Sequence, residues 1–179
     1  MTTSTMIQAP ASNEYDRHYA TYIDPVAHED VMRQLEAQAQ STPKLLATIP
    51  ESRAGFRYAP GKWSIRDIIG HLSDSERIFA YRALRIARHD TTPLASFDEN
   101  AYADVAGFDN RTLADVGAEF AAVRASTITL FRSMDADTLA LTGTASGKPI
   151  SVRALAFIIL GHERHHLNVI KAKYLTEAK

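Results

Sequence analysis

The longest run of regularly spaced apolar residues lies near the C-terminus, over residues 152–175. One stripe of this run recurs at spacings of four, three, four and three: Leu155, Ile159, His162, His166 and Val169. This spacing matches the period of an α-helix. The hydroxyl of Ser151 can accept a hydrogen bond from a free amide of the first turn. The sequence therefore predicts a long helix that begins after Ser151 and turns one stripe towards the core.

Two histidines, His162 and His166, take apolar positions on this stripe. Side chains at i and i+4 lie on one helix face, roughly 5–6 Å apart at Cβ, so two imidazole nitrogens can bind one cation. The alternative is that both only fill the core, but burying neutral imidazoles without partners costs on the order of 1–3 kcal/mol each. Glu163 and His165 should point off this face, as surface residues or as indirect supports of a ligand. The pair predicts a metal site.

Three further segments repeat the amphipathic pattern: residues 25–49, 64–88 and 112–134. Ser64 followed by Asp67, and Thr112 followed by Asp115, are typical of helix N-termini. Pro43 should break or kink the first of these helices. We find no convincing strand pattern. Four amphipathic helices with long connections predict an all-α four-helix bundle.

Composition restricts the class of protein. A chain of 179 residues with 45% apolar side chains can fill one core, and we expect a flexible leader over residues 1–13 and a single domain over residues 14–179. Tyrosines within residues 14–24 should pack along the body. The net charge of −1 offers no basic surface for nucleic acid or membrane, and we find neither a membrane span nor a signal peptide. We therefore expect a cytoplasmic protein that acts on a small molecule.

Histidines and carboxylates are the available metal ligands, because the chain has no cysteine. His71, on the second predicted helix, flanks its apolar stripe. Sites in helical bundles are commonly built from inward side chains of facing helices, so an antiparallel pairing would bring His71 to His162 and His166. Asp74 and Ser75 share the face of His71 and could orient a ligand or a bound water. A solvated helix flank is the alternative for these two residues.

The connection over residues 90–110 is long enough to serve as an active-site lid. Asp98 and Glu99 within it could approach a metal, or could contribute only surface charge. The end of the preceding helix carries three arginines: Arg82, Arg85 and Arg88. They could line a pocket for an anionic ligand, although offsetting the helix dipole is the simpler explanation.

Residues 162–166 also match H-E-x-x-H, the zinc-protease motif in which the glutamate is the general base. Such proteases usually take a third ligand downstream of the motif. Only 13 residues follow His166, none of them is a histidine, and the one carboxylate, Glu177, lies at the end of the chain. With no strand to hold a peptide, a protease is disfavoured.

Five segments carry a family resemblance: residues 60–66, 70–72, 79–84, 92–94 and 161–167. Trp-Ser, a histidine seven residues after that serine, and a late His-x-x-x-His are together more specific than any one part. These segments resemble the DinB-like superfamily of four-helix-bundle metalloproteins, which includes bacillithiol-transferase-like proteins, mycothiol-dependent isomerases and metal-dependent hydrolases. The resemblance covers most of the chain from about Glu14 onward. It implies that a divalent metal, zinc or nickel, is bound by His71, His162 and His166.

Three neutral imidazoles leave positions on a metal where water or a thiol can bind and lose a proton. The family resemblance makes a metal-dependent thiol S-transferase, with a low-molecular-weight thiol as cosubstrate, the first hypothesis. A metal-dependent hydrolase on the same site is the second. The third is a non-catalytic, metal-stabilised binding or stress-related protein, with a homodimer formed through exposed bundle faces.

Overall fold

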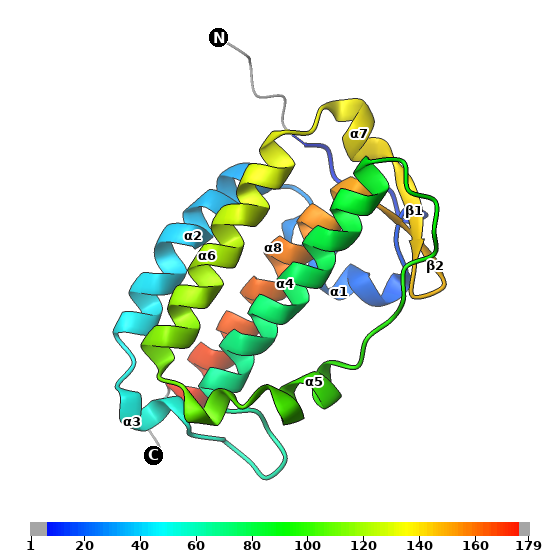
Figure 1. Ribbon diagram of the computed structural model, residues 1–179. Coiled ribbons are helices and arrows are strands. Elements are labelled where there is room, and N and C mark those ends of the chain that lie inside the picture. The colour runs from blue at the N-terminus through cyan, green and yellow to red at the C-terminus, as the bar shows by residue number, and fades with distance from the viewer. Residues whose placement is uncertain (1–6, 176–179) are drawn as a thin grey trace.

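The computed structural model describes residues 7–175, and four long helices form its body (Figure 1). They are α2 (Val31–Ala47), α4 (Ile65–Ala87), α6 (Leu113–Arg132) and α8 (Val152–Val169). Helix α4 packs against α6 and α8, and α2 packs against the same two helices. Helices α2 and α4 therefore lie at opposite corners of the expected four-helix bundle.

Figure 1 shows that α4 and α8 run antiparallel, whereas α4 and its other neighbour α6 run parallel. The hydroxyl of Tyr174 donates to the carbonyl oxygen of Trp63 at 2.6 Å, which ties the end of the last helical segment to the start of α4. A 20-residue helix spans about 30 Å. A connection between parallel neighbours must return over that length, so the long segment between α4 and α6 follows from the helix order.

The expected capping residues begin three of the four helices. The hydroxyl of Ser64 accepts from the Asp67 amide at 3.1 Å, and the Asp67 carboxylate accepts from the Ser64 amide at 2.8 Å. This reciprocal pair satisfies two amides that an α-helix leaves free. The hydroxyls of Thr112 and Ser151 cap α6 and α8 by accepting from the amides of Asp115 and Ala154, without a return bond.

The first helix differs from the expectation in two ways. It begins at Val31 instead of residue 25, after Asp30, whose carboxylate accepts from the amide of Arg33. Of the break or kink predicted at Pro43, the break is wrong, because the proline lies inside a continuous helix. Leu46, beyond the proline, is buried in the bundle. Tertiary packing of the apolar face therefore overrides the local preference of proline.

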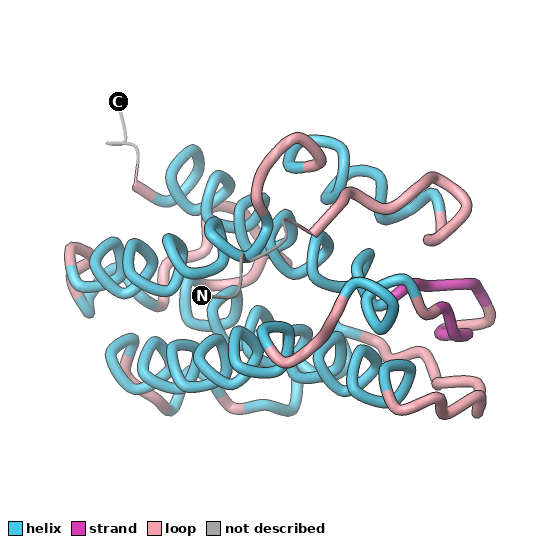
Figure 2. Tube along the Cα trace, turned by 90° about the horizontal axis from the view of Figure 1, so that it is seen from above, coloured by secondary structure: helices cyan, strands magenta, loops and turns pink. Residues whose placement is uncertain are grey.

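The expectation that the chain has no strand is also wrong. The connection before α8 contains the short helix α7 (Ala136–Ala140) and an antiparallel hairpin of β1 (Thr142–Ala145) and β2 (Lys148–Ser151). Ser146 and Gly147 link the strands with φ values of +54° and +73°, as in a type I′ turn. Both views place the hairpin at the edge of the molecule, outside the four helices (Figures 1 and 2). Strands of four residues are too short for their alternation to stand out in the sequence.

Short elements cover the bundle ends and its open side. They are α1 (Ala20–Ile23), α3 (Glu51–Ala54), α5 (Glu99–Ala106), the 3-10 turns Arg17–Tyr19, Asp24–Val26 and Phe108–Asn110, and a π-helical turn, Ile170–Tyr174. Leu94, between α4 and α5, bonds to the hairpin through the carbonyl of Thr144 and the amide of Ser146, both at 2.9 Å. No helix within residues 7–175 has the length and apolar character needed to cross a bilayer.

The N-terminal tyrosines pack along the bundle, as expected, with α1 against α8. They are partly buried: Tyr15, Tyr19 and Tyr22. Residues 1–6 of the expected leader lie outside the described residues. Of the remainder, Ile7 is only 8% exposed and belongs to the core. The packed part of the chain therefore begins before residue 14, because the side chain of Ile7 is covered by the core.

The core consists of two apolar clusters with a polar layer between them. One cluster includes Leu35, Phe79, Ile128 and Leu155, and the other includes Leu46, Leu72, Phe120 and Leu167. Between them, every long helix contributes buried polar residues: Gln38, Thr42, Ser75, Glu76, Arg124, His162 and Glu163. The candidate functional residues therefore lie in the middle of the bundle, between two apolar halves that hold the helices together.

Candidate metal centre

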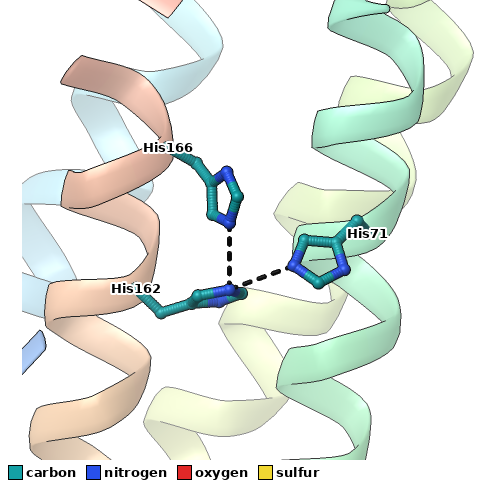
Figure 3. A group of neighbouring side chains, drawn as sticks. All are labelled: His71, His162 and His166. Carbon is teal, nitrogen blue, oxygen red and sulfur yellow. Dashed lines mark hydrogen bonds between the residues drawn. The ribbon is translucent and has the colours of Figure 1, made fainter. Parts of the chain in front are cut away.

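Three histidines point towards one another across the interface of α4 and α8 (Figure 3). Nε2 of His162 lies 3.0 Å from Nε2 of His71 and 3.1 Å from Nε2 of His166. The ligand nitrogens of all three lie within 4.8 Å of one another. The structure thus brings together the three residues that the sequence singled out, and we call them the histidine cluster.

Two glycines each immediately precede a residue of the histidine cluster and let another segment approach its helix. A Cβ at Gly70 would lie 2.2 Å from the ring of Phe108, and a Cβ at Gly161 would lie 1.9 Å from the carbonyl oxygen of Tyr22. Because Gly161 has no side chain, α1 packs against α8. The ring of Tyr22 then lies with its centroid 5.1 Å from that of His162.

The histidine cluster has the donor chemistry and the spacing of a metal site. Nitrogens bound to one divalent ion at roughly 2.0–2.1 Å, at angles of 90–110°, are about 2.9–3.4 Å apart. Both short Nε2 distances in the cluster, 3.0 and 3.1 Å, fall in this range. Nε2 of a neutral imidazole carries either one proton or one lone pair. That of His162 therefore cannot bond well to both neighbours, whereas one cation can accept all three lone pairs.

Burial favours the neutral form of these histidines. Removal from water lowers the pKa of His71 to about 4. Burial, together with the neighbouring His71 and His165, lowers the pKa of His166 to about 3. Burial, and then the neighbouring histidines, holds the pKa of His162 well below its usual range. Near neutral pH all three rings therefore offer the lone pairs that a metal requires.

Ser75 and Asp74, the two expected supporting residues, differ in their contacts. Oγ of Ser75 lies 3.3 Å from Nδ1 of His71. A hydrogen bond at this nitrogen orients the ring and leaves Nε2 free towards the cluster. Asp74 instead pairs with Arg77 at 3.5 Å, and within residues 7–175 no hydrogen bond joins it to a histidine. Ser75 has the contact of a supporting residue, and Asp74 matches the helix-flank alternative.

The histidine cluster lines a pocket of about 220 Å³. The opposite walls come from the N-terminal arm, from the connection after α4 and from the hairpin, through residues that include Tyr19, Tyr22, Phe97 and Ser146. These lining residues were missed in the sequence, because nothing in their spacing relates them to the histidines. Only tertiary packing makes them neighbours.

Of the charged residues proposed in the 90–110 connection and at the end of α4, some line the pocket and others do not. Glu99 borders the pocket, whereas the carboxylate of Asp98 caps α5 by accepting from the amides of Asn100 and Ala101. Arg82 also lines the pocket. Arg85 pairs with Asp90 outside it. One acid and one arginine of those considered therefore reach the pocket.

We expected Glu163, the residue after His162, to be either a surface residue or an indirect support of a ligand. It is not at the surface. It is 1% exposed, and its Oε2 lies 2.6 Å from Nη1 of Arg124. The guanidinium of Arg124 also donates to both oxygens of Glu76 at 2.8 Å, and Glu163 accepts from the hydroxyl of Thr42. Glu163 does point off the histidine face, but the opposite face of α8 is covered by α2 and α6. His165 is exposed, as expected.

Arg124, Glu76 and Glu163, with Gln38 and Thr42, form what we call the ion cluster. Burial opposes the charge of Arg124, but the two carboxylates raise its pKa. Burial also raises the pKa of Glu163, against the attraction of Arg124. The unbroken apolar run 154–160 was a usable signal that α8 is buried on every side, since a helix that is apolar all round is covered all round.

The family model of the DinB superfamily matches residues 34–170 of this sequence. Among solved structures, the fold is similar to that of YfiT from Bacillus subtilis, described as a probable metal-dependent hydrolase with an unusual four-helix bundle topology. The TM-score is 0.74 at 15% sequence identity, over 92% of this chain and 91% of that chain. No curated protein matches the sequence. At this identity the likeness establishes the arrangement of the helices.

Proposed function

This chain belongs to the DinB superfamily, and from that membership and the site geometry we propose that it is a metal-dependent enzyme for small molecules, with a divalent ion bound by the histidine cluster. The observation that carries the proposal is the convergence of three neutral histidine nitrogens at one pocket, from two buried side chains, His71 and His162, and one half-buried side chain, His166. Three protein ligands are typical of catalytic metal sites, because a position stays open for a reactant. The pocket, about 220 Å³, is smaller than the roughly 300–1,000 Å³ of sites for drug-sized ligands.

Within this class we favour the transfer of a low-molecular-weight thiol. A bound divalent ion, zinc or nickel, supplies Lewis acidity that lowers the pKa of a coordinated thiol or water. The chain has no cysteine, so the thiol has to come from a cosubstrate. Within residues 7–175 no carboxylate belongs to the histidine cluster. A thiol needs no general base once it has lost its proton, whereas attack by water usually gains from one.

Aromatic side chains around the histidine cluster would shape the substrate site. The ring of Trp63 lies with its centroid 4.6 Å from that of His71, and the ring of Phe79 lies 6.0 Å from that of His162. With Tyr22 they exclude water from the histidines and offer apolar walls to the substrate. Water exclusion strengthens the electrostatic interactions inside the pocket.

Hydrolysis at the same site is the second candidate. The description of the Bacillus subtilis relative as a probable metal-dependent hydrolase favours it. The carboxylate of Glu99, at the border of the pocket, could act as the general base that accepts a proton from an attacking water. Hydrolysis therefore predicts that Glu99→Gln lowers turnover strongly, whereas thiol transfer predicts a small effect.

The metal proposal is tested by elemental analysis of protein purified without an affinity tag. We expect a divalent ion in the wild type and in His165→Ala, whose ring is exposed, and its loss in His71→Ala. Equal loss in both variants, or no metal uptake by the wild type after zinc and nickel are supplied, contradicts the proposal.

The choice between the two chemistries requires the loaded protein. We would follow thiol capture of monochlorobimane with a panel of low-molecular-weight thiols, and release of nitrophenol from small nitrophenyl esters. Thiol-dependent turnover that disappears in His71→Ala supports transfer, and ester cleavage without thiol supports hydrolysis. A loaded protein that is inert in both but melts at a higher temperature than the metal-free form would support a non-catalytic, metal-stabilised role.

A further inference from the structure

Arg82 lies on the same face of α4 as His71, three helical turns further along, at a Cα separation of about 16 Å. It is 1% exposed and lines the same pocket as the histidine cluster. Side chains of an α-helix lean towards the helix N-terminus. The side chain of Arg82 therefore leans towards the histidines from the far end of the pocket.

The guanidinium of Arg82 is held in place by neutral groups. Its Nη2 donates to the carbonyl oxygen of Ala95 at 2.7 Å and to the hydroxyl of Ser146 at 3.1 Å. The ring of Phe97 lies 5.8 Å from its central carbon. Leu94 bonds the segment that carries Ala95 and Phe97 to the hairpin that carries Ser146. These contacts orient the guanidinium and leave its charge uncompensated.

The other arginines of α4 each have a carboxylate partner. Arg66 pairs with Glu51, Arg77 with Glu119, and Arg85 with Asp90. Arg124, the other arginine that is almost completely buried, pairs with two glutamates. Among the described arginines and lysines, Arg82 alone is almost completely buried and has no ion pair. A guanidinium keeps its proton in proteins, and a buried charge is costly unless it is paired.

The pocket has an asymmetric charge distribution. Of the described residues that line it, Arg82 is the only arginine or lysine and Glu99 is the only carboxylate. Glu99 is exposed, so water and salt screen its charge, whereas Arg82 is buried and is screened much less. The inner part of the pocket therefore favours an anion.

We propose that Arg82 binds a carboxylate of the ligand whose reacting group lies at the histidine cluster. The substrate class is then a small molecule, a thiol in the favoured chemistry, with a carboxylate at one end and the metal-binding group at the other. A guanidinium suits this role because it stays charged, and Nε and Nη1 still have hydrogens to donate to a carboxylate while Nη2 donates to Ala95 and Ser146. The inference rests on the proposed function, since it places the reacting group at the histidines.

The test compares thiols that differ only in their charged end, on cobalt(II)-loaded protein. The probes are mercaptoacetate, mercaptopropionate and mercaptohexanoate, each beside the alcohol of the same length. Binding is followed by the cobalt–thiolate absorption band, which reports coordination without turnover. In the wild type we expect at least one acid to bind about tenfold more tightly than its alcohol, as one charge-assisted contact allows.

Three variants assign that preference. Arg82→Gln should reduce the ratio of acid to alcohol affinity to near one, Arg82→Lys should retain part of it, and Arg85→Gln should leave it unchanged. The ratio is an internal control, because a general loosening of the pocket in Arg82→Gln weakens the acid and the alcohol together. A wild-type ratio near one at every length, or an unchanged ratio in Arg82→Gln, overturns the inference.

The experiment distinguishes failure of the proposed metal site from failure of the proposed carboxylate site at Arg82. If the wild type takes up none of zinc, nickel and cobalt, the metal proposal fails, and the same probes are compared by the change in Tm that they cause in the metal-free protein. Stabilisation by the acids alone, lost in Arg82→Gln, retains the anion site. An equal response to acids and alcohols overturns it.

Discussion

His162 and Glu163 are neighbours on α8 and are both almost completely buried, yet they enter two different polar environments. Nε2 of His162 faces two other neutral bases at 3.0 and 3.1 Å. Glu163 faces Arg124, whose guanidinium also binds Glu76. The histidine cluster thus gathers three bases without an acid, while the ion cluster pairs opposite charges.

Both clusters are buried, so burial does not tell a candidate site from a structural network. The difference is whether the polar groups can all form hydrogen bonds or ion pairs with one another. Each long helix contributes to the ion cluster, and its donors and acceptors bond mainly to one another. Little capacity remains there for a ligand. The histidine cluster borders a pocket and keeps lone pairs that its own members cannot satisfy. Such a group is suited to bind a cation.

The largest expected effect concerns the ion cluster. Arg124→Met would leave Glu76 and Glu163 buried without a cation, and should lower the free energy of unfolding by about 3–5 kcal/mol. Urea denaturation measures the change. Combining Arg124→Met with Glu76→Gln and Glu163→Gln should recover much of the loss, because no unpaired charge remains. A loss below about 1 kcal/mol in Arg124→Met would contradict a structural role for the cluster.

The second prediction separates the two faces of α8. His162→Ala should weaken zinc binding by at least about 100-fold, or about 2.7 kcal/mol, because the central nitrogen of the histidine cluster is lost. Competition with a coloured chelator measures the affinity. Glu163→Gln is the matched control: it should lower stability and leave zinc affinity at the wild-type value. Equal zinc losses in the two variants would show that the faces do not act separately.

A smaller effect is expected at Ser75, which orients His71 without taking part in the cluster. Ser75→Ala should weaken zinc binding by about tenfold, or about 1.4 kcal/mol. Ser73→Ala is the control, since the hydroxyl of Ser73 is also buried but bonds to the carbonyl of Ile69. The same chelator competition applies. If both variants lose the same affinity, the Ser75 contact has no special part in the site.

The smallest expected effect on stability concerns the ion pair of Arg153 and Glu14, which is more exposed than the ion cluster. The side-chain hydrogen bond from Arg153 lowers the pKa of Glu14 from 4.5 to about 2. The ionised form therefore stabilises the fold above pH 4.5, and this contribution falls as the pH drops towards 2. Glu14→Gln should cost about 1 kcal/mol at pH 7, after allowance for solvent screening. Denaturation curves of the wild type and the variant should converge in acid, and a difference that is independent of pH would count against the ion pair.

Local patterns were sufficient for the starts of three long helices, α4, α6 and α8, and for the shared face of His162 and His166. The serine and threonine caps of α4, α6 and α8 depend on residues three positions apart, so the sequence contains all the information that they need. His162 and His166 share a face because of the helical period alone. The helical period placed His71 beside the apolar stripe of its helix, and the family resemblance gave the same three histidines. The antiparallel packing of α4 and α8 then brought His71 to the other two.

Tertiary structure decided the features that depend on distant residues. Pro43 remains inside a helix because both sides of it pack into the bundle. Glu163 is buried because helices far away in the sequence cover its face of α8. Tyr22 reaches the pocket because Gly161 lets α1 approach.

Arg82 shows the same division between sequence and structure most clearly. In the sequence Arg82 was one of three arginines that could line a pocket, and offsetting the helix dipole was the simpler explanation for all three. Only the folded chain shows that acids pair with its neighbours on α4 while its own guanidinium is buried at the pocket. Periodicity determines which residues share a helix face. Burial and charge pairing are set by contacts between segments that the chain order does not specify.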